Sequence, residues 1–404
     1  MPRPRTDTAR PRSPSGPEGH TVVRGATVVT KAGPRSDAEV VVADGLIIEI
    51  RPAQGPVPDV TVVPGFVDLQ VNGIGAIDVA GAAGGDWAAL DRALLAQGVT
   101  TWCPTVVTAP LEALEASLAG IAAAAGRPAQ GRPHIAGAHL EGPFLAVHGA
   151  HRREFVRDHV ELGWLEDLGD RVRVLTLAPE LPGALDAVAA LSGRGVLVAL
   201  GHSACSAEVA LEATEAGARL VTHLGNAMGP LHQRAPGLLG AALADDRLSV
   251  SVIADLVHTH PVFVAAAFAA KTGRGGASGD GASSDGASGG VVLVTDAVAV
   301  PAPRPTPRGP AATPSGPPRL PDGTLAGSVL TMPGAISNVV RHSGVSLTHA
   351  VEAASTAPAR LLGLDDRGII EPGRRADLVA LEGTEDGGWR VASVWVAGVL
   401  SPES

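Results

Sequence analysis

Short runs of apolar residues recur along most of this chain and alternate with stretches of helical spacing. Eight such runs occupy residues 66–70, 100–104, 134–139, 172–176, 196–200, 219–222, 248–254 and 291–295. Between them, Ala and Leu follow the spacing of amphipathic helices, for example over residues 87–97, 111–125, 184–191 and 207–216. Continuous apolar strands that alternate with helices predict an α/β fold, in which eight parallel strands close into a TIM-like (β/α)8 barrel.

Both ends of the chain show a different pattern, with short Val-rich runs separated by Gly, Pro and Asp. These runs lie within residues 21–50 and again at 376–381 and 391–399. The pattern is typical of short strands in an antiparallel sheet. We therefore expect residues 21–63 and 366–404 to form one small β-sandwich domain, and residues 64–365 to form the barrel.

Three segments fit neither pattern. Residues 1–20 are rich in Pro, Arg and Ser and lack the apolar core of a signal peptide, so we expect a disordered tail. Residues 273–290 are almost entirely Gly, Ser, Ala and Asp, which predicts a flexible insertion. The Pro-rich residues 302–321 follow the eighth predicted strand and form either a lid over the mouth or an ordinary surface loop.

Composition narrows the partner and the compartment. The formal net charge is −10, and the only cysteines, Cys103 and Cys205, are far apart. An acidic chain offers no electrostatic footprint for nucleic acid, and two isolated cysteines build no disulfide framework. No run of about 18 apolar residues, the length that spans a membrane, occurs. We expect a cytoplasmic protein that acts on a small molecule and binds neither nucleic acid nor membrane.

Polar side chains stand where the predicted strands end. Glu141 follows the third strand, His202 the fifth, His223 the sixth and Asp296 the eighth. In an α/β barrel these ends meet at one mouth, where catalytic groups lie. Two imidazoles and one carboxylate match the three-ligand sites of catalytic zinc, so we interpret Glu141, His202 and His223 as metal ligands. The alternative for each histidine taken alone is an ordinary hydrogen-bonded residue at a strand end.

Asp296 ends the apolar run that begins at Val291. A carboxylate at the edge of the expected metal site suits general acid and base catalysis, because it can take a proton from water and deliver it to a leaving amine. The alternative is a helix N-cap or surface-turn aspartate.

Ordered sequence blocks carry a resemblance to a known family. They read PGFVDLQVNG at 64–73, HLEGPF at 139–144, LAPE at 177–180, GHS at 201–203, THLGNAM at 222–228 and LAGS at 325–328. These blocks are similar to motifs of the N-acetylglucosamine-6-phosphate deacetylases, metal-dependent hydrolases of the amidohydrolase superfamily. The resemblance covers residues 21–399 and implies a barrel of that hydrolase type.

The resemblance implies an activity. A divalent metal would help water to release acetate from N-acetylglucosamine 6-phosphate, in amino-sugar catabolism and cell-wall recycling. Asp296 would act as base and acid, and His151 would polarise the acetyl carbonyl. Two other interpretations stay open: an amidohydrolase for another amide, such as N-acetylgalactosamine 6-phosphate, and a non-catalytic barrel that serves as a scaffold.

The first predicted strand carries Gln70 and Asn72 where many amidohydrolases carry His-x-His. Neutral amides are poor ligands for zinc. The only lysines, Lys31 and Lys271, are at no predicted strand end, so the carboxylated-lysine bridge of some relatives cannot form. The resemblance therefore implies one divalent metal per subunit, with zinc first and iron or another ion as alternatives.

Substrate contacts are also implied by the resemblance. Ala150 and His151 would contact the substrate, with His151 near the acetyl carbonyl. Asn226 and Ala227 would offer amide groups to the sugar phosphate.

Two further contacts are implied at the phosphate end of the substrate. His258 would approach the hydroxyl or phosphate groups, although His260 lies two residues on and only one of the two need face the mouth. Arg234 would reach the phosphate in the neighbouring subunit's site, since a guanidinium group matches phosphate oxygens well, and this implies a homodimer. The alternative for Arg234 is a solvated loop charge.

Overall fold

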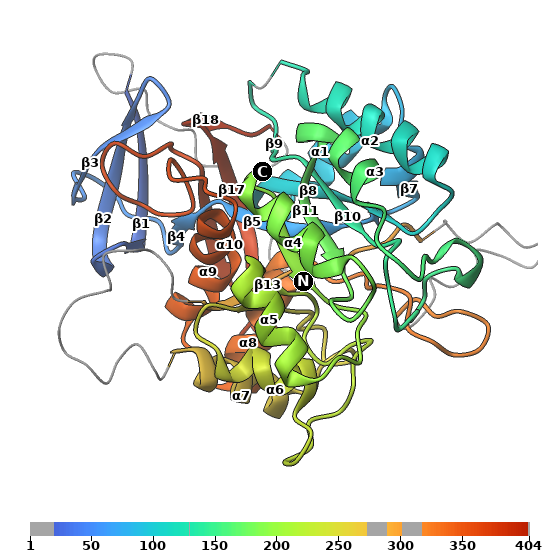
Figure 1. The fold of residues 1–404 in the computed structure, drawn as a ribbon. Helices are drawn as coiled ribbons and strands as arrows, with labels where there is room; N and C mark the ends of the chain where they lie inside the picture. Colours follow the sequence, from blue (N-terminus) through green and yellow to red (C-terminus); the bar gives the residue numbers. More distant parts are fainter. Residues whose placement is uncertain (1–19, 129, 273–288, 301–316, 403–404) are drawn as a thin grey trace, which may run out of the picture.

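Eight parallel strands form a nearly closed barrel, as the alternating pattern predicts (Figure 1). The computed structural model describes residues 20–128, 130–272, 289–300 and 317–402. In hydrogen-bonded order the barrel strands are β5 (Phe66–Val71), β8 (Val99–Val107), β10 (Ala138–Glu141), β11 (Val172–Leu177), β12 (Leu197–Leu200), β13 (Leu220–Val221), β14 (Ser249–Val252) and β15 (Val291–Leu293). The predicted tail and most of residues 273–290 and 302–321 lie outside the described residues.

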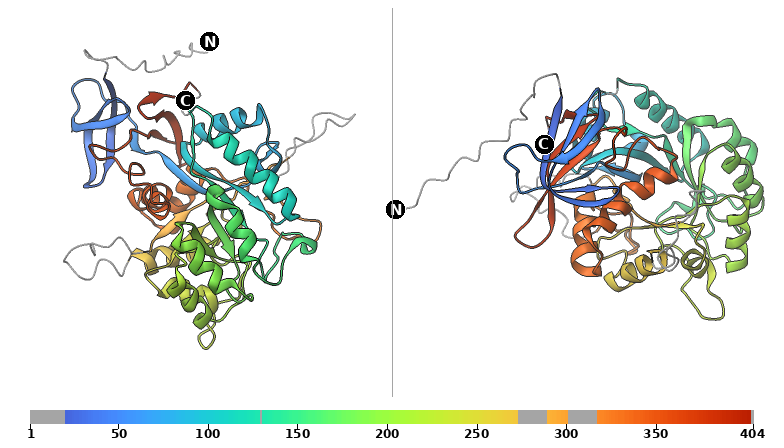
Figure 2. Two further views of the ribbon diagram at one scale, coloured as in Figure 1. Left: turned by 45° about the horizontal axis from the view of Figure 1, so that its top comes forward. Right: turned by 90° about the vertical axis from the view of Figure 1, so that its left-hand side faces the viewer.

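Helices pack around the outside of the barrel (Figures 1 and 2). They are α1 (Asp86–Leu95), α2 (Leu111–Ala125), α3 (Leu162–Asp167), α4 (Ala184–Gly193), α5 (Ala207–Ala216), α6 (Gly237–Ala244), α7 (Pro261–Thr272), α8 (Met332–Ser343), α9 (Leu347–Ala354) and α10 (Thr356–Leu361). Helix α2 illustrates the packing, because Leu114, Leu118 and Ile121 recur once per turn and are all buried. None of the helices described is long and apolar enough to cross a membrane.

The third predicted strand, residues 134–139, is interrupted. The chain forms β9 (His134–Ile135) and then β10, and both pair with β8. Gly137 lies between them with φ 129°, a conformation that glycine adopts without strain. A Cβ atom there would meet the Cβ of Arg173 at 2.6 Å. The prediction of one continuous strand is wrong, because an apolar run does not reveal a change in backbone conformation.

The two chain ends form one curled sheet beside the barrel (Figure 2). Its strand order is β18 (Val399–Leu400), β17 (Trp389–Val396), β16 (Leu378–Gly383), β4 (Thr61–Pro64), β1 (Thr21–Thr30), β2 (Gly33–Ala43) and β3 (Leu46–Pro52). Strand β4 joins the two ends, because it pairs in parallel with β1 and antiparallel with β16. Val28, Val40 and Trp395 belong to a separate apolar core here. The domain boundaries themselves stay predictions.

The C-terminal ends of the barrel strands meet at one mouth. Glu141 ends β10, and His202, His223 and Asp296 follow β12, β13 and β15 within three residues. The first and last strands meet where the backbone N–H of Asp296 donates to the carbonyl of Gln70 at 2.9 Å. Parallel pairing therefore gathers side chains that are far apart in the sequence.

Candidate active site

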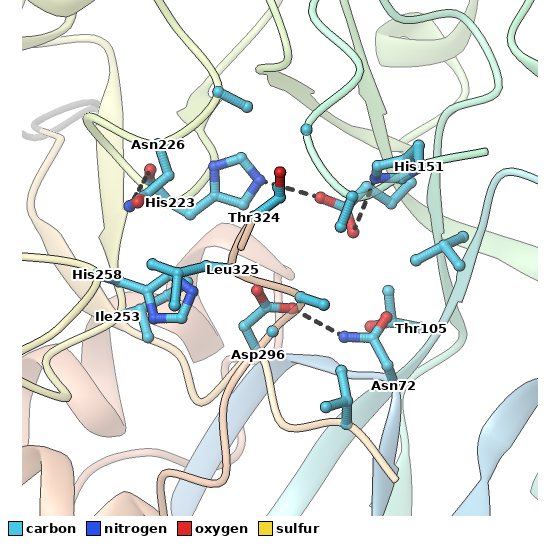
Figure 3. A pocket seen from close by; sticks show the side chains of 18 of the residues that line it. Asn72, Thr105, His151, His223, Asn226, Ile253, His258, Asp296, Thr324 and Leu325 are labelled. Carbon is cyan, nitrogen blue, oxygen red and sulfur yellow. Dashed lines mark hydrogen bonds and ion pairs between the residues drawn. The ribbon is translucent and has the colours of Figure 1, made fainter. Parts of the chain in front are cut away.

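The mouth of the barrel holds a cavity of about 590 Å³ (Figure 3). Its wall includes every site residue predicted from the sequence except Arg234, namely Glu141, Ala150, His151, His202, His223, Asn226, Ala227, His258 and Asp296. Arg234 is exposed on the loop before α6. The predicted strand-end residues thus share one cavity.

The three predicted metal ligands converge at the bottom of this cavity. Oε1 of Glu141 lies 3.2 Å from Nε2 of His202 and 3.1 Å from Nε2 of His223, and the two Nε2 atoms are 3.1 Å apart. All three residues are at most 5% exposed. Ligand atoms of Glu141, His151 and His202 also lie within 4.8 Å of one another. The described residues therefore contain a Glu/His/His cluster that can bind a metal.

Backbone conformation at the strand ends turns these side chains inward. His202, His223 and Asp296 have φ of 49°, 33° and 48°, in the left-handed region that non-glycine residues seldom adopt. Such strain clusters at functional sites. Gly201 allows the close packing before His202, since a Cβ there would meet Cγ2 of Thr222 at 2.3 Å.

The donor set suits a divalent metal. Nδ1 of His202 lies 2.8 Å from the carbonyl of Val147. When Nδ1 carries the proton and donates to that carbonyl, Nε2 presents its lone pair to the cluster, which is the usual arrangement for a ligating histidine. Burial alone would raise the pKa of Glu141, but its contacts with His202 and His223 outweigh burial and hold that pKa well below its ordinary value. A charged carboxylate and imidazole lone pairs are what zinc prefers.

His151 is held by a residue that the sequence did not single out. Its Nδ1 lies 2.8 Å from the hydroxyl of Thr108, the residue that follows β8, and its Nε2 lies 4.0 Å from Oε2 of Glu141. Burial and the charge of His202 lower the pKa of His151 to about 3, so its ring is neutral and carries one proton. If Thr108 donates to Nδ1, that proton is on Nε2, where it can be donated to a carbonyl oxygen.

Asp296 is oriented by Asn72, the residue directly after the first strand of the barrel. Nδ2 of Asn72 donates to its Oδ1 at 2.8 Å (Figure 3), which leaves Oδ2 to other partners. Burial, followed by the charge of Glu141, raises the pKa of Asp296 to about 7. A carboxyl group with a pKa near neutrality can both accept and release a proton. The alternative of a helix N-cap or surface-turn aspartate does not fit Asp296, because its side chain is buried in the cavity wall.

His258, rather than His260, faces the cavity. His258 lines the wall, and its Nδ1 contacts Oδ2 of Asp255 at 2.7 Å. His260 is exposed and absent from the wall. Asp255 also accepts the backbone N–H of His258 at 2.7 Å, so this side chain is fixed before any ligand arrives.

A family model decides the relationship. The model of the amidohydrolase family matches residues 61–400. The chain belongs to the amidohydrolase family. Among solved structures, this amidohydrolase is similar to N-acetylglucosamine-6-phosphate deacetylase from Thermotoga maritima, with a TM-score of 0.80, 29% identity, and coverage of 95% of this chain and 100% of that one. A variant of the Mycobacterium smegmatis deacetylase in complex with N-acetyl-D-glucosamine-6-phosphate gives a TM-score of 0.78 at 29% identity and covers 95% and 99%.

Curated relatives of this amidohydrolase carry two sugar names. N-acetylgalactosamine-6-phosphate deacetylase from Escherichia coli O157:H7 is 34% identical, over 94% of this chain and 99% of the relative. N-acetylglucosamine-6-phosphate deacetylase from Bos taurus is 35% identical, over 83% of this chain and 82% of the relative. Both names describe hydrolysis of an acetyl amide on an amino-sugar phosphate.

Two further residues of the site, Thr108 and Arg319, were not predicted from the sequence. Thr108 follows an apolar strand, a position that could have marked it as a strand-end polar residue. Arg319 lines the cavity but lies at the end of the Pro-rich stretch, where no periodic pattern gave a signal.

Proposed function

We propose that this amidohydrolase removes the acetyl group of N-acetylglucosamine 6-phosphate to give glucosamine 6-phosphate and acetate. The convergence of Glu141, His202 and His223 within 3.2 Å, in a cavity that also holds Asp296, carries the proposal. Deacetylase relatives that align with this chain over most of both sequences support the substrate class. A scaffold without catalysis is disfavoured, since it has no need for a buried, strained cluster of titratable groups.

Glu141, His202 and His223 would hold one divalent metal, for which zinc is the first choice. Such a metal lowers the pKa of a water molecule and polarises a carbonyl group. The assignment of one metal rests on the amides Gln70, near the end of β5, and Asn72, directly after it, which are poor ligands.

The side chains of the cavity would carry the proton transfers. Asp296 takes a proton from the attacking water and then delivers it to the amine nitrogen as the carbon-nitrogen bond breaks. Nε2 of His151 donates a hydrogen bond to the acetyl oxygen and so stabilises the negative charge that develops there. The buried hydrogen bonds of Asn72 and Thr108 keep both groups in place.

Ala150, Asn226, Ala227 and His258 would contact the sugar phosphate, since all four line the cavity. Arg234 is proposed to enter the site of a second subunit in a homodimer. Its exposure on a loop supports this role, because a side chain that crosses to a partner must be accessible in the single chain. The proposed compartment is the cytoplasm, in keeping with two cysteines that are both free and buried.

Acetate release tests the function. Protein loaded with zinc or iron is given N-acetylglucosamine 6-phosphate, and a chelator-treated sample and the unphosphorylated sugar serve as controls. We expect rapid release that depends on the metal and on the phosphate, and that returns when metal is restored. Metal-loaded protein that releases no acetate would contradict the proposal.

N-acetylgalactosamine 6-phosphate is the second candidate substrate, because the E. coli O157:H7 relative bears that name. The two sugars differ only at the C4 hydroxyl, so the acetyl group and the phosphate can take the same places. Measuring kcat/KM for both in parallel separates the candidates. A higher value for the galactosamine form would transfer the proposal to that sugar.

A further inference from the structure

The cavity of a single chain is poor in positive charge. Its charged lining residues include the acids Asp78, Glu141 and Asp296, whereas Arg319 is the only arginine or lysine among the described residues of the wall. A phosphate dianion needs a strong, fixed cation nearby to offset its loss of hydration. Arg319 is the residue of this wall that can provide a permanent charge.

A short hairpin positions Arg319 at the rim. Arg319 pairs with Leu325 in an antiparallel bridge, and the backbone N–H of Leu320 donates to the carbonyl of Thr324 at 2.8 Å. The Arg319 Nη1 donates to the carbonyl of Gly323 at 2.7 Å, which ties the guanidinium to its own turn. Thr324 and Leu325 of the same hairpin line the cavity (Figure 3).

The guanidinium of Arg319 keeps most of its donors for a ligand. Its only hydrogen bond within the described part of the chain goes to a backbone carbonyl, and no carboxylate there pairs with it. The tie to Gly323 limits its motion, so binding an anion costs less conformational entropy. Arg319 is thus a restrained cation with no counter-ion of its own among the described residues.

The burial of the lining residues indicates where the two ends of the substrate would lie in the cavity. Glu141 and His223 are 3% and 4% exposed, whereas Arg319 is exposed. The amide on C2 must reach the buried cluster to react, and the phosphate on C6 projects from the other side of the sugar ring. An amide at the bottom therefore directs the phosphate toward the rim.

We infer that Arg319 binds the phosphate of the substrate within its own subunit, as a specificity-determining residue of this site. The inference rests on the proposed function and deepens it. The cation lies on the hairpin that also contributes Thr324 and Leu325 to the wall, so one element would contact both the phosphate and the sugar. Arg234 from a partner subunit would add to this contact.

Kinetics with two substrates test the role. Acetate release from N-acetylglucosamine 6-phosphate and from N-acetylglucosamine is compared for the wild type, Arg319→Gln and Arg319→Lys. Arg319→Gln should lower kcat/KM about 10- to 100-fold for the phosphorylated sugar, the usual range for a charged hydrogen bond, and leave the value for the plain sugar unchanged. Arg319→Lys keeps the charge but not the bidentate geometry, so its kcat/KM for the phosphorylated sugar should lie between those of the wild type and Arg319→Gln.

Arg171→Gln is the matched control. Arg171 also donates to carbonyls of its own turn, with Nε to Leu168 at 2.8 Å and Nη2 to Asp167 at 3.1 Å, and it does not line the cavity. The kcat/KM of this variant should equal that of the wild type for both sugars. Arg234→Gln is measured beside it, to separate the two arginines.

Two outcomes would overturn the inference. In the first, Arg319→Gln leaves kcat/KM for the phosphorylated sugar unchanged. In the second, it lowers kcat/KM equally for both sugars, which would mean that the arginine only supports the hairpin. Binding of glucosamine 6-phosphate by calorimetry separates this from the proposed function. If the wild type releases no acetate but Arg319→Gln weakens this binding, the function fails and the phosphate contact stands. If the wild type releases acetate but Arg319→Gln binds glucosamine 6-phosphate as tightly as the wild type, the proposed function stands and the phosphate contact fails.

Discussion

The two halves of the barrel mouth are built from different chemistry. The ligand half, Glu141, His202 and His223, brings titratable groups together at 3.1–3.2 Å. The amide half, Gln70 on β5 and Asn72 directly after it, brings neutral groups that contact neighbours. Oε1 of Gln70 accepts from Thr222 at 3.1 Å, and Asn72 donates to Asp296 at 2.8 Å.

Two buried carboxylates sharpen this contrast. In the ligand half, contacts with the two histidines outweigh burial and keep the pKa of Glu141 low. On β5, burial dominates for Asp68, whose pKa rises to about 6 although Thr295 donates to it. Burial thus gives opposite net pKa shifts at the two sites, because the carboxylate of Glu141 contacts two histidines, whereas that of Asp68 is held by a hydroxyl group and backbone N–H groups.

Removing the acid between the halves should have the largest effect. Asp296→Asn keeps the shape but cannot take a proton, so kcat should fall about a thousandfold, within the range of general acid and base catalysis. Metal content, measured by atomic absorption, should stay at the wild-type level. The control is Asp78→Asn, which changes another acid of the cavity wall. An active Asp296→Asn protein would contradict the role.

The pH dependence of the unfolding free energy tests the raised pKa of Asp68, which lies on β5 beside the amide half. The folded-state pKa of Asp68 lies above its ordinary value of 3.8, so its stabilising contribution is full below pH 3.8 and is lost as the pH rises through 6. The wild type should therefore lose up to about 3 kcal/mol of unfolding free energy relative to Asp68→Asn between pH 4 and 7. Denaturant unfolding of both proteins measures this. Parallel pH curves would refute it.

Asn72→Ala probes positioning in the amide half. Without the donor to Asp296, the carboxylate loses its fixed orientation, and kcat should fall about tenfold, the cost of a lost hydrogen bond to a charged group. Metal content should not change, because Asn72 is not a ligand. A parallel loss of metal and activity would break the comparison, since the amide half would then belong to the metal site.

The smallest effect is expected at Thr108. Thr108→Val keeps the side-chain shape but leaves Nδ1 of His151 without its hydroxyl partner, so kcat should fall about fivefold with KM unchanged. Thr108→Ser restores the hydroxyl and should recover the rate. If the serine variant is as slow as the valine variant, the methyl group matters and the hydroxyl does not.

The sequence was sufficient for the barrel and for the strand-end residues, for a geometric reason. Parallel strands must end at one mouth, so Glu141, His202, His223 and Asp296 could be grouped without coordinates. The break in the third strand at Gly137 could not be foreseen, because apolar patterning records burial and not backbone direction.

The side-chain contacts were beyond the sequence. Thr108 meets His151 across 43 positions, and Asn72 meets Asp296 across 224. Such pairs depend on how strands and loops pack in three dimensions, which residue spacing does not encode. Arg319 lies within the Pro-rich residues 302–321, for which a lid over the mouth was one of two predictions, but nothing in that stretch singled out this side chain for the cavity wall. The role of Arg234 stays a prediction.

The left-handed backbone at His202, His223 and Asp296 has a consequence for protein engineering. Each of these residues turns its side chain into the mouth through a conformation that is unfavourable for it locally. Transplanting only the residue identities onto the strand ends of another barrel would leave the side chains in ordinary extended backbone, aimed elsewhere. A designer who wishes to move this chemistry must therefore copy three bends of the main chain, together with the packing that holds them.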